Sequence, residues 1–178
     1  MTPDLDDRVD ALLEPWHAAL GPDLTGYRNH CRRVAAFALA LAPPGPEVAE
    51  KLAVAAAFHD LGIWTDRTFD YLAPSRRLAR AHLEATGRGD WAEELAAMID
   101  LHHKCTPFTA RPDWLVEPFR RADWADVTLG LRRRGLPAAL VREVRARHPN
   151  AGFHRRLLAL SWERLRRHPA SPLPMLRW

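Results

Sequence analysis

Residues 51–64 have the sequence KLAVAAAFHDLGIW, in which a run of apolar and small residues ends on a histidine and an aspartate. Apolar side chains at nearly every position before His59 are typical of a helix that is buried on all sides. We therefore predict a central helix over residues 46–61 that carries His59 and Asp60 into the interior. Gly62 is expected to terminate this helix, and residues 63–73 are expected to form a loop.

The segments on both sides of this stretch alternate between helical periodicity and breaks that contain proline or glycine. Alanine and leucine dominate and β-branched runs are scarce, so we predict an all-α fold without a sheet. The expected architecture is a helical bundle of about seven to eight helices. Besides the central helix, the predicted helices span residues 4–20, 25–41, 75–86, 90–103, 113–134 (which Pro118 can interrupt), 137–147 and 150–168.

The chain has 178 residues, of which 47% are hydrophobic and 27% charged, and this composition is typical of one globular domain. We predict a single domain over residues 1–178, with a core around the site at 25–134. The C-terminal helices and an apolar tail that packs back on the body would occupy 137–178. No apolar run is long enough to span a bilayer, so we expect no membrane partner.

The compartment is predicted from the N-terminus and the cysteines. The first ten residues, MTPDLDDRVD, are acidic where a signal peptide would be basic. Cys31 and Cys105 are too few for a disulfide framework and have no CxxC partner. We therefore expect a cytoplasmic protein without zinc-finger chemistry.

The net charge is +4, and arginine carries nearly all of the positive charge. Runs at 132–134 and 164–167 form a basic surface that would suit phosphate-bearing ligands or nucleic acid. The plainer interpretation, which we favour for these two runs, is that they lie on solvated helix faces. Nucleic acid is therefore an admissible partner but not the favoured one.

Histidines and aspartates fall at positions where their predicted helices face inward. Imidazole and carboxylate are costly to bury alone, and metal coordination satisfies both. A set of histidines and carboxylates without thiolate suits Mn, Fe, Co, Zn or Mg. We therefore predict one or two divalent metal ions of open identity. The inward-facing residues are His30, His59, Asp60, His82, His102, His103 and Asp123.

The order His30, His59–Asp60, Asp123 resembles the H…HD…D signature of the HD superfamily, whose members are helical metal-dependent phosphohydrolases. The resemblance covers residues 30–123 and, through the helices that complete such bundles, most of the chain. It implies that His30, His59, Asp60 and Asp123 bind a first metal ion. Asp126, one helical turn beyond Asp123, is an alternative ligand.

The fuller order H…HD…H…HH…D is similar to HD proteins that hold two metals, including HD-GYP cyclic-dinucleotide phosphodiesterases and di-iron oxygenases. It implies that Asp60 bridges two ions and that His82 and His102 bind the second. Whether His102 or His103 is the ligand stays open. Residues 102–108, HHKCTPF, depart from the HD-GYP pattern, so that substrate is not transferred. Residues 69–75, 102–104 and 173–178 also resemble a group of small bacterial HD proteins of undefined activity.

These resemblances predict a metal-dependent hydrolase that uses metal-activated water on a small phosphorylated substrate, as a phosphomonoesterase, nucleotidase or phosphodiesterase. Asp60, His103 and Lys104 are the predicted catalytic residues. Two alternatives are a di-iron oxygenase acting on a small polyol or phosphonate, and a non-catalytic domain that binds nucleotides or nucleic acid. The cations expected to bind substrate are Lys104, Arg76, Arg77, Arg80 and Arg120, the last of which is equally a candidate partner of Asp123.

Overall fold

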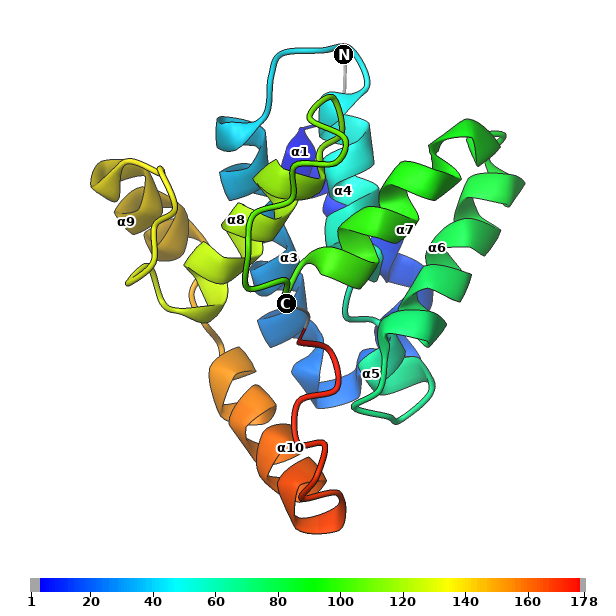
Figure 1. Cartoon of the computed structure of the whole chain (residues 1–178), viewed down its shortest axis with the longest axis vertical. Coiled ribbons are helices and arrows are strands. Elements are labelled where there is room, and N and C mark those ends of the chain that lie inside the picture. Colours follow the sequence, from blue (N-terminus) through cyan, green and yellow to red (C-terminus); the bar gives the residue numbers. More distant parts are fainter. Residues whose placement is uncertain (1–3, 177–178) are drawn as a thin grey trace.

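The computed structural model describes residues 4–176, and these form helices joined by loops, with no strand among them (Figure 1). The predicted all-α fold is confirmed. Two helices form the centre, α3 (Leu24–Leu41) and α4 (Val48–Phe58), and α4 is buried from Leu52 to Phe58 as predicted. α3 packs against α4, α8 (Val116–Val127) and α1 (Leu5–Leu13).

A second pair of helices, α6 (Leu72–Ala85) and α7 (Ala92–Leu101), packs side by side and contacts α4 (Figure 1). α7 also packs on α8, so α7 lies beside both α4 and α8. The shorter elements are the 3₁₀ turns Glu14–Trp16, Gly21–Asp23 and Gly89–Trp91, and the single-turn helices α2 (His17–Leu20) and α5 (Gly62–Thr65).

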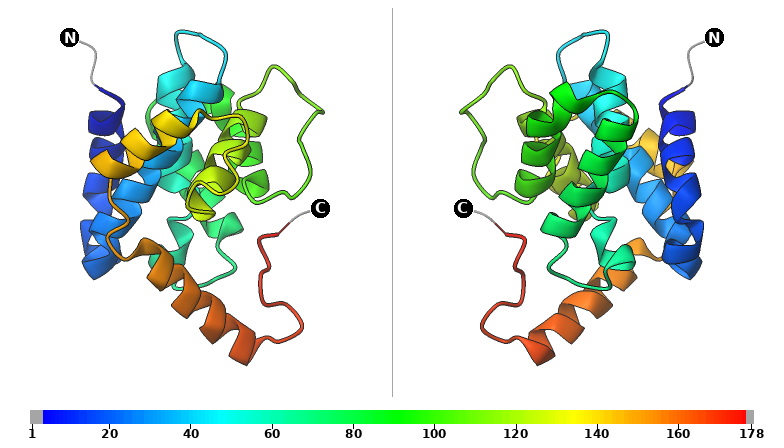
Figure 2. Two further views of the ribbon diagram at one scale, coloured as in Figure 1. Left: turned by 90° about the vertical axis from the view of Figure 1, so that its left-hand side faces the viewer. Right: turned by 90° about the vertical axis from the view of Figure 1, so that its right-hand side faces the viewer.

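The C-terminal part extends beyond this core. α9 (Ala138–Arg147) contacts α3, whereas α10 (Phe153–Arg167) buries Phe153 at its start and then projects from the bundle (Figure 2). The tail turns back toward the body (Figure 2), and Met175 is buried. The predicted residues Arg177 and Trp178 lie outside the described residues. No helix within residues 4–176 combines the length and hydropathy needed to cross a membrane.

Prolines account for two differences from the predicted helices. The predicted helix over 4–20 ends at Leu13, because Pro15 enters a 3₁₀ turn instead of a helix interior, where its ring would clash. Pro118 does not interrupt α8, since it lies in the first turn, where backbone N–H groups have no intrahelical partner. The predicted helix over 113–134 is only α8, and the residues after Val127 form turns in which Leu129 and Arg134 adopt positive φ.

Gly62 has a different role from the terminator that its sequence position suggests. α4 ends at Phe58, and Gly62 begins the short helix α5. A Cβ atom at Gly62 would lie 2.7 Å from the carbonyl oxygen of Tyr71 and 2.8 Å from Cβ of Pro74. Glycine therefore permits the start of α6 to pack directly on α5, and this close approach places Tyr71 beside the end of α4.

Candidate metal centre

His59 and Asp60 lie in the turn that follows α4, and both are buried. The backbone N–H of His59 still donates to the carbonyl of Ala55, so the ring continues the inward face of the helix. Nδ1 of His59 lies 2.9 Å from the carbonyl oxygen of Ala56, which can only accept a hydrogen bond. Nδ1 therefore carries the proton, and Nε2 directs its lone pair toward the centre.

Four buried side chains converge on one point, and we call them the first ligand group: His30, His59, Asp60 and Asp123. Nε2 of His30 lies 3.0 Å from Nε2 of His59. Asp60 Oδ2 lies 3.5 Å from Nε2 of His59 and 3.8 Å from Nε2 of His30. Asp123 Oδ1 lies 3.8 Å from both nitrogens. Ligand atoms about 2.1 Å from one ion stand roughly 3 to 4 Å from each other, so the ligand atoms of His30, His59 and Asp60 fit a single divalent ion, with Asp123 beside them.

A second ligand group consists of Asp60, His102 and His103. Asp60 Oδ1, the oxygen not used above, lies 3.4 Å from Nε2 of His102. Nδ1 of His102 lies 2.7 Å from the carbonyl oxygen of Ile99, which again leaves Nε2 facing inward. Nδ1 of His103 lies 3.1 Å from Asp123 Oδ2. Each carboxylate therefore presents one oxygen to each side, and Asp60 has the geometry of a bridging ligand.

The hydrogen bonds and charge of the carboxylates indicate whether the centre suits a cation. Asp60 Oδ1 and Asp123 Oδ1 are buried and accept no hydrogen bond from the described residues, whereas Asp123 Oδ2 faces Nδ1 of His103. Buried anionic oxygens without partners are strongly unfavourable, and a metal ion removes that cost. Burial raises the pKa of both carboxyl groups, but the neighbouring His59 and His103 outweigh it and keep each pKa below its ordinary value. The centre therefore offers two ionised carboxylates.

The two sides of the centre differ in the pKa of their histidines. Burial lowers the pKa of His59 to about 4, even though Asp60 opposes the change, so this ligand is neutral at pH 7. Burial also lowers the pKa of His103, but the adjacent Asp123 outweighs it and raises the pKa above the ordinary value. The side chain of His103 is 16% exposed, whereas that of His59 is fully buried, so His103 lies on the side of the centre nearest to solvent.

A second layer of side chains fixes His30. Nδ1 of His30 lies 2.7 Å from Asp126 Oδ2, and the buried guanidinium of Arg33 donates to both oxygens of Asp126 at 2.6 and 2.8 Å. The sequence indicated Asp126 as an alternative metal ligand to Asp123. In the structure, Asp126 is instead the hydrogen-bond partner of His30, which orients the ring and keeps its proton on Nδ1. The sequence indicated no role for Arg33.

Tyr71 is a further residue that sequence reasoning missed. Its hydroxyl lies 3.4 Å from Nε2 of His102 and 3.1 Å from Nε2 of His103. Burial, together with the charges of Asp60 and Asp123, raises the pKa of Tyr71 well above its ordinary value, so the hydroxyl is neutral. The only sequence signal was an isolated tyrosine in residues 69–75, immediately before the apolar face of α6.

The structure does not bring His82 to the centre, which corrects its prediction as a second-metal ligand. Its ring is half-buried against Phe58, with ring centroids 5.3 Å apart, and Glu50 is the charge that acts on it. His82 lies about two helical turns beyond Ser75, the residue of α6 that contacts Gly62 next to the centre. The inward stripe of α6 consists of Leu72, Ser75, Ala79 and Leu83, and His82 flanks it.

The predicted substrate-binding arginines also lie elsewhere. On the exposed face of α6, Arg76 pairs with Asp100, Arg77 with Asp66 and Arg80 with Glu84. These pairs occupy the guanidinium groups away from the centre, and none of the three arginines contacts either ligand group. The prediction that they bind substrate is therefore not supported by their positions.

Arg120 is a buried structural residue. Its guanidinium donates to Glu117 at 2.7 Å and to the carbonyl oxygen of Lys104 at 2.9 Å, so these groups, and not Asp123, are its hydrogen-bond partners. Nε1 of Trp124 donates to the same carbonyl at 3.2 Å. The backbone of Lys104 is therefore fixed directly after His103, while the Lys104 ammonium contacts Thr106.

Comparison with known families agrees with this geometry. A family model described as the HD domain matches residues 27–127. No curated protein and no solved structure matches the chain. The matched segment contains every residue of both ligand groups, together with Tyr71 and Asp126.

Proposed function

The chain belongs to the HD domain family, whose members are generally metal-dependent hydrolases, and we propose that it is a phosphohydrolase with two divalent ions. The observation that carries the proposal is the convergence of the two ligand groups on Asp60. One carboxylate oxygen faces His30 and His59, and the other faces His102.

In this proposal the first ligand group holds one ion, and Asp60, His102 and His103 hold another. When bound, such ions polarise a phosphoryl oxygen and promote ionisation of water at neutral pH. Asp60 and Asp123 contribute two negative charges to a buried space, and these would repel a phosphate unless cations were present. The residues of the centre therefore favour binding of metal before substrate.

The partly exposed His103 and the neutral hydroxyl of Tyr71 border the side from which a substrate would approach. Tyr71 can donate a hydrogen bond because its pKa is raised. Without an ion, Asp123 favours the protonated form of His103 by raising its pKa, and binding of the second ion would displace that proton. Lys104 follows His103 and is the nearest cation along the chain for the phosphate group. We propose a small phosphate ester as the substrate.

A di-iron oxygenase is the second candidate, because the bridging geometry of Asp60 suits any chemistry that needs two adjacent ions. The same residues would then hold two irons, and the substrate would be a small polyol or phosphonate. The two candidates differ in metal content, oxygen consumption and phosphate release.

Elemental analysis of protein purified without chelator tests both candidates. It is paired with hydrolysis assays on p-nitrophenyl phosphate, bis-p-nitrophenyl phosphate and nucleotides with added Mn, Co, Mg or Fe. Bound transition metal together with phosphate release supports the phosphohydrolase, and its best substrate sets the ester class. Two bound irons together with oxygen consumption and no phosphate release would instead support the oxygenase and contradict the phosphohydrolase.

The variants His59→Ala and His82→Ala provide a matched comparison within the same assay. His59→Ala is expected to lose metal and activity with helical circular dichroism retained, whereas His82→Ala should keep both. Equal metal content in the two variants would contradict the assignment of the first ligand group.

A further inference from the structure

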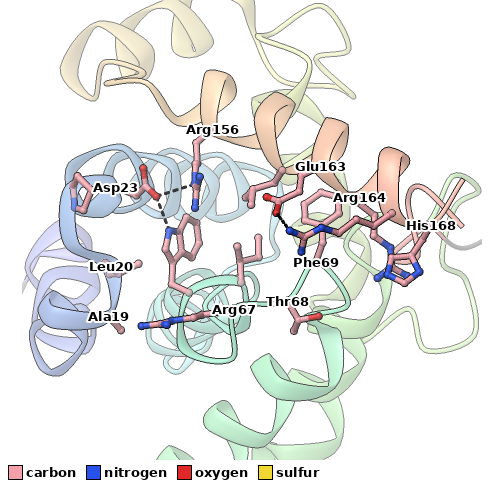
Figure 3. Close-up of a pocket in the computed structure, with 15 residues that line it drawn as sticks. Ala19, Leu20, Asp23, Arg67, Thr68, Phe69, Arg156, Glu163, Arg164 and His168 are labelled. Carbon is pink, nitrogen blue, oxygen red and sulfur yellow. Dashed lines mark hydrogen bonds and ion pairs between the residues drawn. The ribbon is translucent and has the colours of Figure 1, made fainter.

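The helix α10 has an inner face that is turned toward the body of the protein. This face lines a cavity of about 580 Å³ between α10 and the segment that follows α5, and Arg156, Glu163 and Arg164 lie on it (Figure 3). Arg156 pairs with Asp23 at 3.0 Å. Glu163 pairs with Arg167 at 2.9 Å. The charges of the inner face are therefore largely matched within the molecule.

The outer face of α10 is apolar and exposed. Leu158, Trp162 and Leu165 follow one another at helical spacing, so they form one stripe along the helix, which we call the α10 stripe. Their exposed fractions are 71%, 63% and 40%. None of the three lines the cavity, and α10 projects from the bundle (Figure 2). The stripe therefore lies in solvent.

Two arginines continue the α10 stripe at its ends. Arg155 precedes Leu158 by one helical turn, and Arg166 follows Trp162 by one turn, so both project beside the stripe. Both are exposed, and within residues 4–176 neither has an ion-pair partner. Glu163 is the one acidic residue of α10, and it lies on the inner face. The outer face is therefore apolar along its centre and cationic at its ends.

This combination of side chains suits the surface of an anionic bilayer. Helices that lie on such a surface carry tryptophan and leucine on one side, and arginines beside them reach back to the headgroups. Tryptophan is enriched where headgroups meet acyl chains. The expectation of no membrane partner rested on the lack of an apolar run long enough to cross a bilayer. A helix that lies on the surface needs no such run.

A second copy of the chain matches the outer face less well. Two α10 stripes placed against each other would bring Arg155 and Arg166 of both copies together without a carboxylate among them. Three side chains also offer far less surface than the roughly 1,200–2,000 Å² that a specific protein interface buries. A bilayer instead attracts each arginine separately and requires no complementary shape.

We propose that α10 binds the surface of an anionic bilayer, with the α10 stripe inserted at the level of the headgroups and with Arg155 and Arg166 on lipid phosphates. Because the apolar area is small and part of the attraction is electrostatic, the binding is reversible and weakens with salt. This interaction goes beyond the proposed hydrolase activity and needs no bound metal.

The test uses the full chain, treated with EDTA, and vesicles of phosphatidylcholine with or without anionic phosphatidylglycerol. Binding is measured by co-sedimentation and by the shift of tryptophan emission to shorter wavelength. We expect binding to the anionic vesicles that decreases as the salt concentration rises, and weaker binding to the neutral vesicles.

One pair of variants tests the apolar contact. Leu165→Ser and Leu39→Ser each remove a leucine that is 40% exposed, the first from the α10 stripe and the second from α3. Leu165→Ser is expected to lower the partition coefficient about fivefold or more, and Trp162→Ser about tenfold or more, whereas Leu39→Ser should bind like the wild type. Helical circular dichroism should be retained in all three variants, because the replaced side chains are exposed.

A second pair tests the charges at equal net charge. Arg155→Gln/Arg166→Gln should lower the partition coefficient roughly 10- to 30-fold. Arg77→Gln/Arg80→Gln removes two exposed arginines from α6, both of which already have carboxylate partners. This control should stay within about twofold of the wild type, because charges away from the contact are screened.

A wild type that does not bind anionic vesicles would overturn the proposal, as would α10 variants that bind as tightly as their controls. Sedimentation velocity without lipid tests for a second copy as the occupant. A dimer that dissociates in Trp162→Ser would assign the stripe to that second copy instead. Binding to a soluble polyglutamate peptide without binding to vesicles would assign the outer face to an acidic protein.

These outcomes are separate from those of the proposed hydrolase. The metal centre shares no residue with α10, and the hydrolysis assays contain no lipid. A protein that releases no phosphate from any ester can still bind vesicles through α10.

Discussion

The Nε2 atoms of His30 and His59 lie 3.0 Å apart, although each ring already uses Nδ1 in a hydrogen bond directed away from the centre. The partners of Nδ1 are a carboxylate and a carbonyl, which accept only. Both Nε2 atoms therefore present lone pairs to each other. Two facing lone pairs repel unless a cation lies between them, so the hydrogen bonds outside the centre dictate what belongs inside it.

Asp60→Asn is expected to remove metal from both ligand groups, because Asp60 is the residue that belongs to both of them. The amide replaces one anionic oxygen with a donor that faces histidine nitrogens or a cation unfavourably. Elemental analysis after gel filtration measures the loss. Asp100→Asn, which alters an exposed partner of Arg76, should retain the wild-type metal content. Full metal content in Asp60→Asn would contradict the bridging role.

Asp126→Asn should weaken metal binding by about 10- to 100-fold without removing a ligand, because Asp126 orients His30. It also leaves the buried Arg33 without its carboxylate, which costs about 3–5 kcal/mol of unfolding free energy. Competition with a chelating dye measures the affinity, and urea unfolding of the metal-free protein measures the stability.

The control for this variant is Asp10→Asn, which breaks the neighbouring but more exposed pair between Asp10 and Arg32. An exposed pair contributes at most about 1 kcal/mol, so both metal affinity and stability should stay near the wild type. If the two variants behaved alike, Asp126 would be an ordinary ion-pair residue and not the support of His30.

Much of the fold follows from local sequence signals. The buried helix α4 was predictable because its own side chains are apolar at nearly every position before His59. The start of α9 was predictable from Pro137. The predicted helices differ from the observed ones where the same residue type is compatible with two local structures. Pro15 enters a 3₁₀ turn, whereas Pro118 fits the first turn of α8, and only the surrounding structure distinguishes these outcomes.

The sequence predicted those site residues that match the family pattern and also lie on the inward face of a helix. His30, His59, Asp60 and Asp123 combine both signals, and the structure brings them together. His82 shared the apparent inward face, but its position along α6 carries it away from the centre. Tyr71 depends on the close packing at Gly62, which is a contact between segments and leaves no periodic pattern in the sequence.

Tyr71→Phe is expected to lower kcat roughly tenfold or more while KM and metal content stay near the wild-type values. The substitution removes only the hydroxyl between His102 and His103 and leaves all the ligands in place. Steady-state kinetics on the best phosphate ester, with elemental analysis, provides the measurement. A loss of metal in parallel with activity would instead identify Tyr71 as part of the ligand set.

Tyr27→Phe is the matched control for that substitution. Its buried hydroxyl donates to the carbonyl oxygen of Ala57 at 3.0 Å and contacts neither His102 nor His103. We expect a loss of about 1 kcal/mol in unfolding free energy with kcat unchanged. An equal fall of kcat in both variants would show that removal of any buried hydroxyl near α4 disturbs the centre.

The metal-free protein should lose stability as the pH falls from 6.5 to about 4. Burial lowers the pKa of His59 from 6.5 to about 4, so in this window the unfolded chain binds a proton that the folded chain excludes. The contribution of neutral His59 is fully present above pH 6.5 and is lost by pH 4, a change of about 3 kcal/mol.

The other groups of the centre act outside this window. Asp60 and Asp123 have lowered pKa values, so their contributions are lost only below pH 4, and the raised pKa of His103 acts above pH 6.5. Urea unfolding of EDTA-treated wild type and His59→Gln between pH 7 and 4.5 isolates His59, because other histidines contribute equally to both proteins. The free energy of unfolding of the wild type, relative to that of His59→Gln, should decrease steadily as the pH falls. A constant difference would mean that His59 titrates normally and that the centre opens to water without metal.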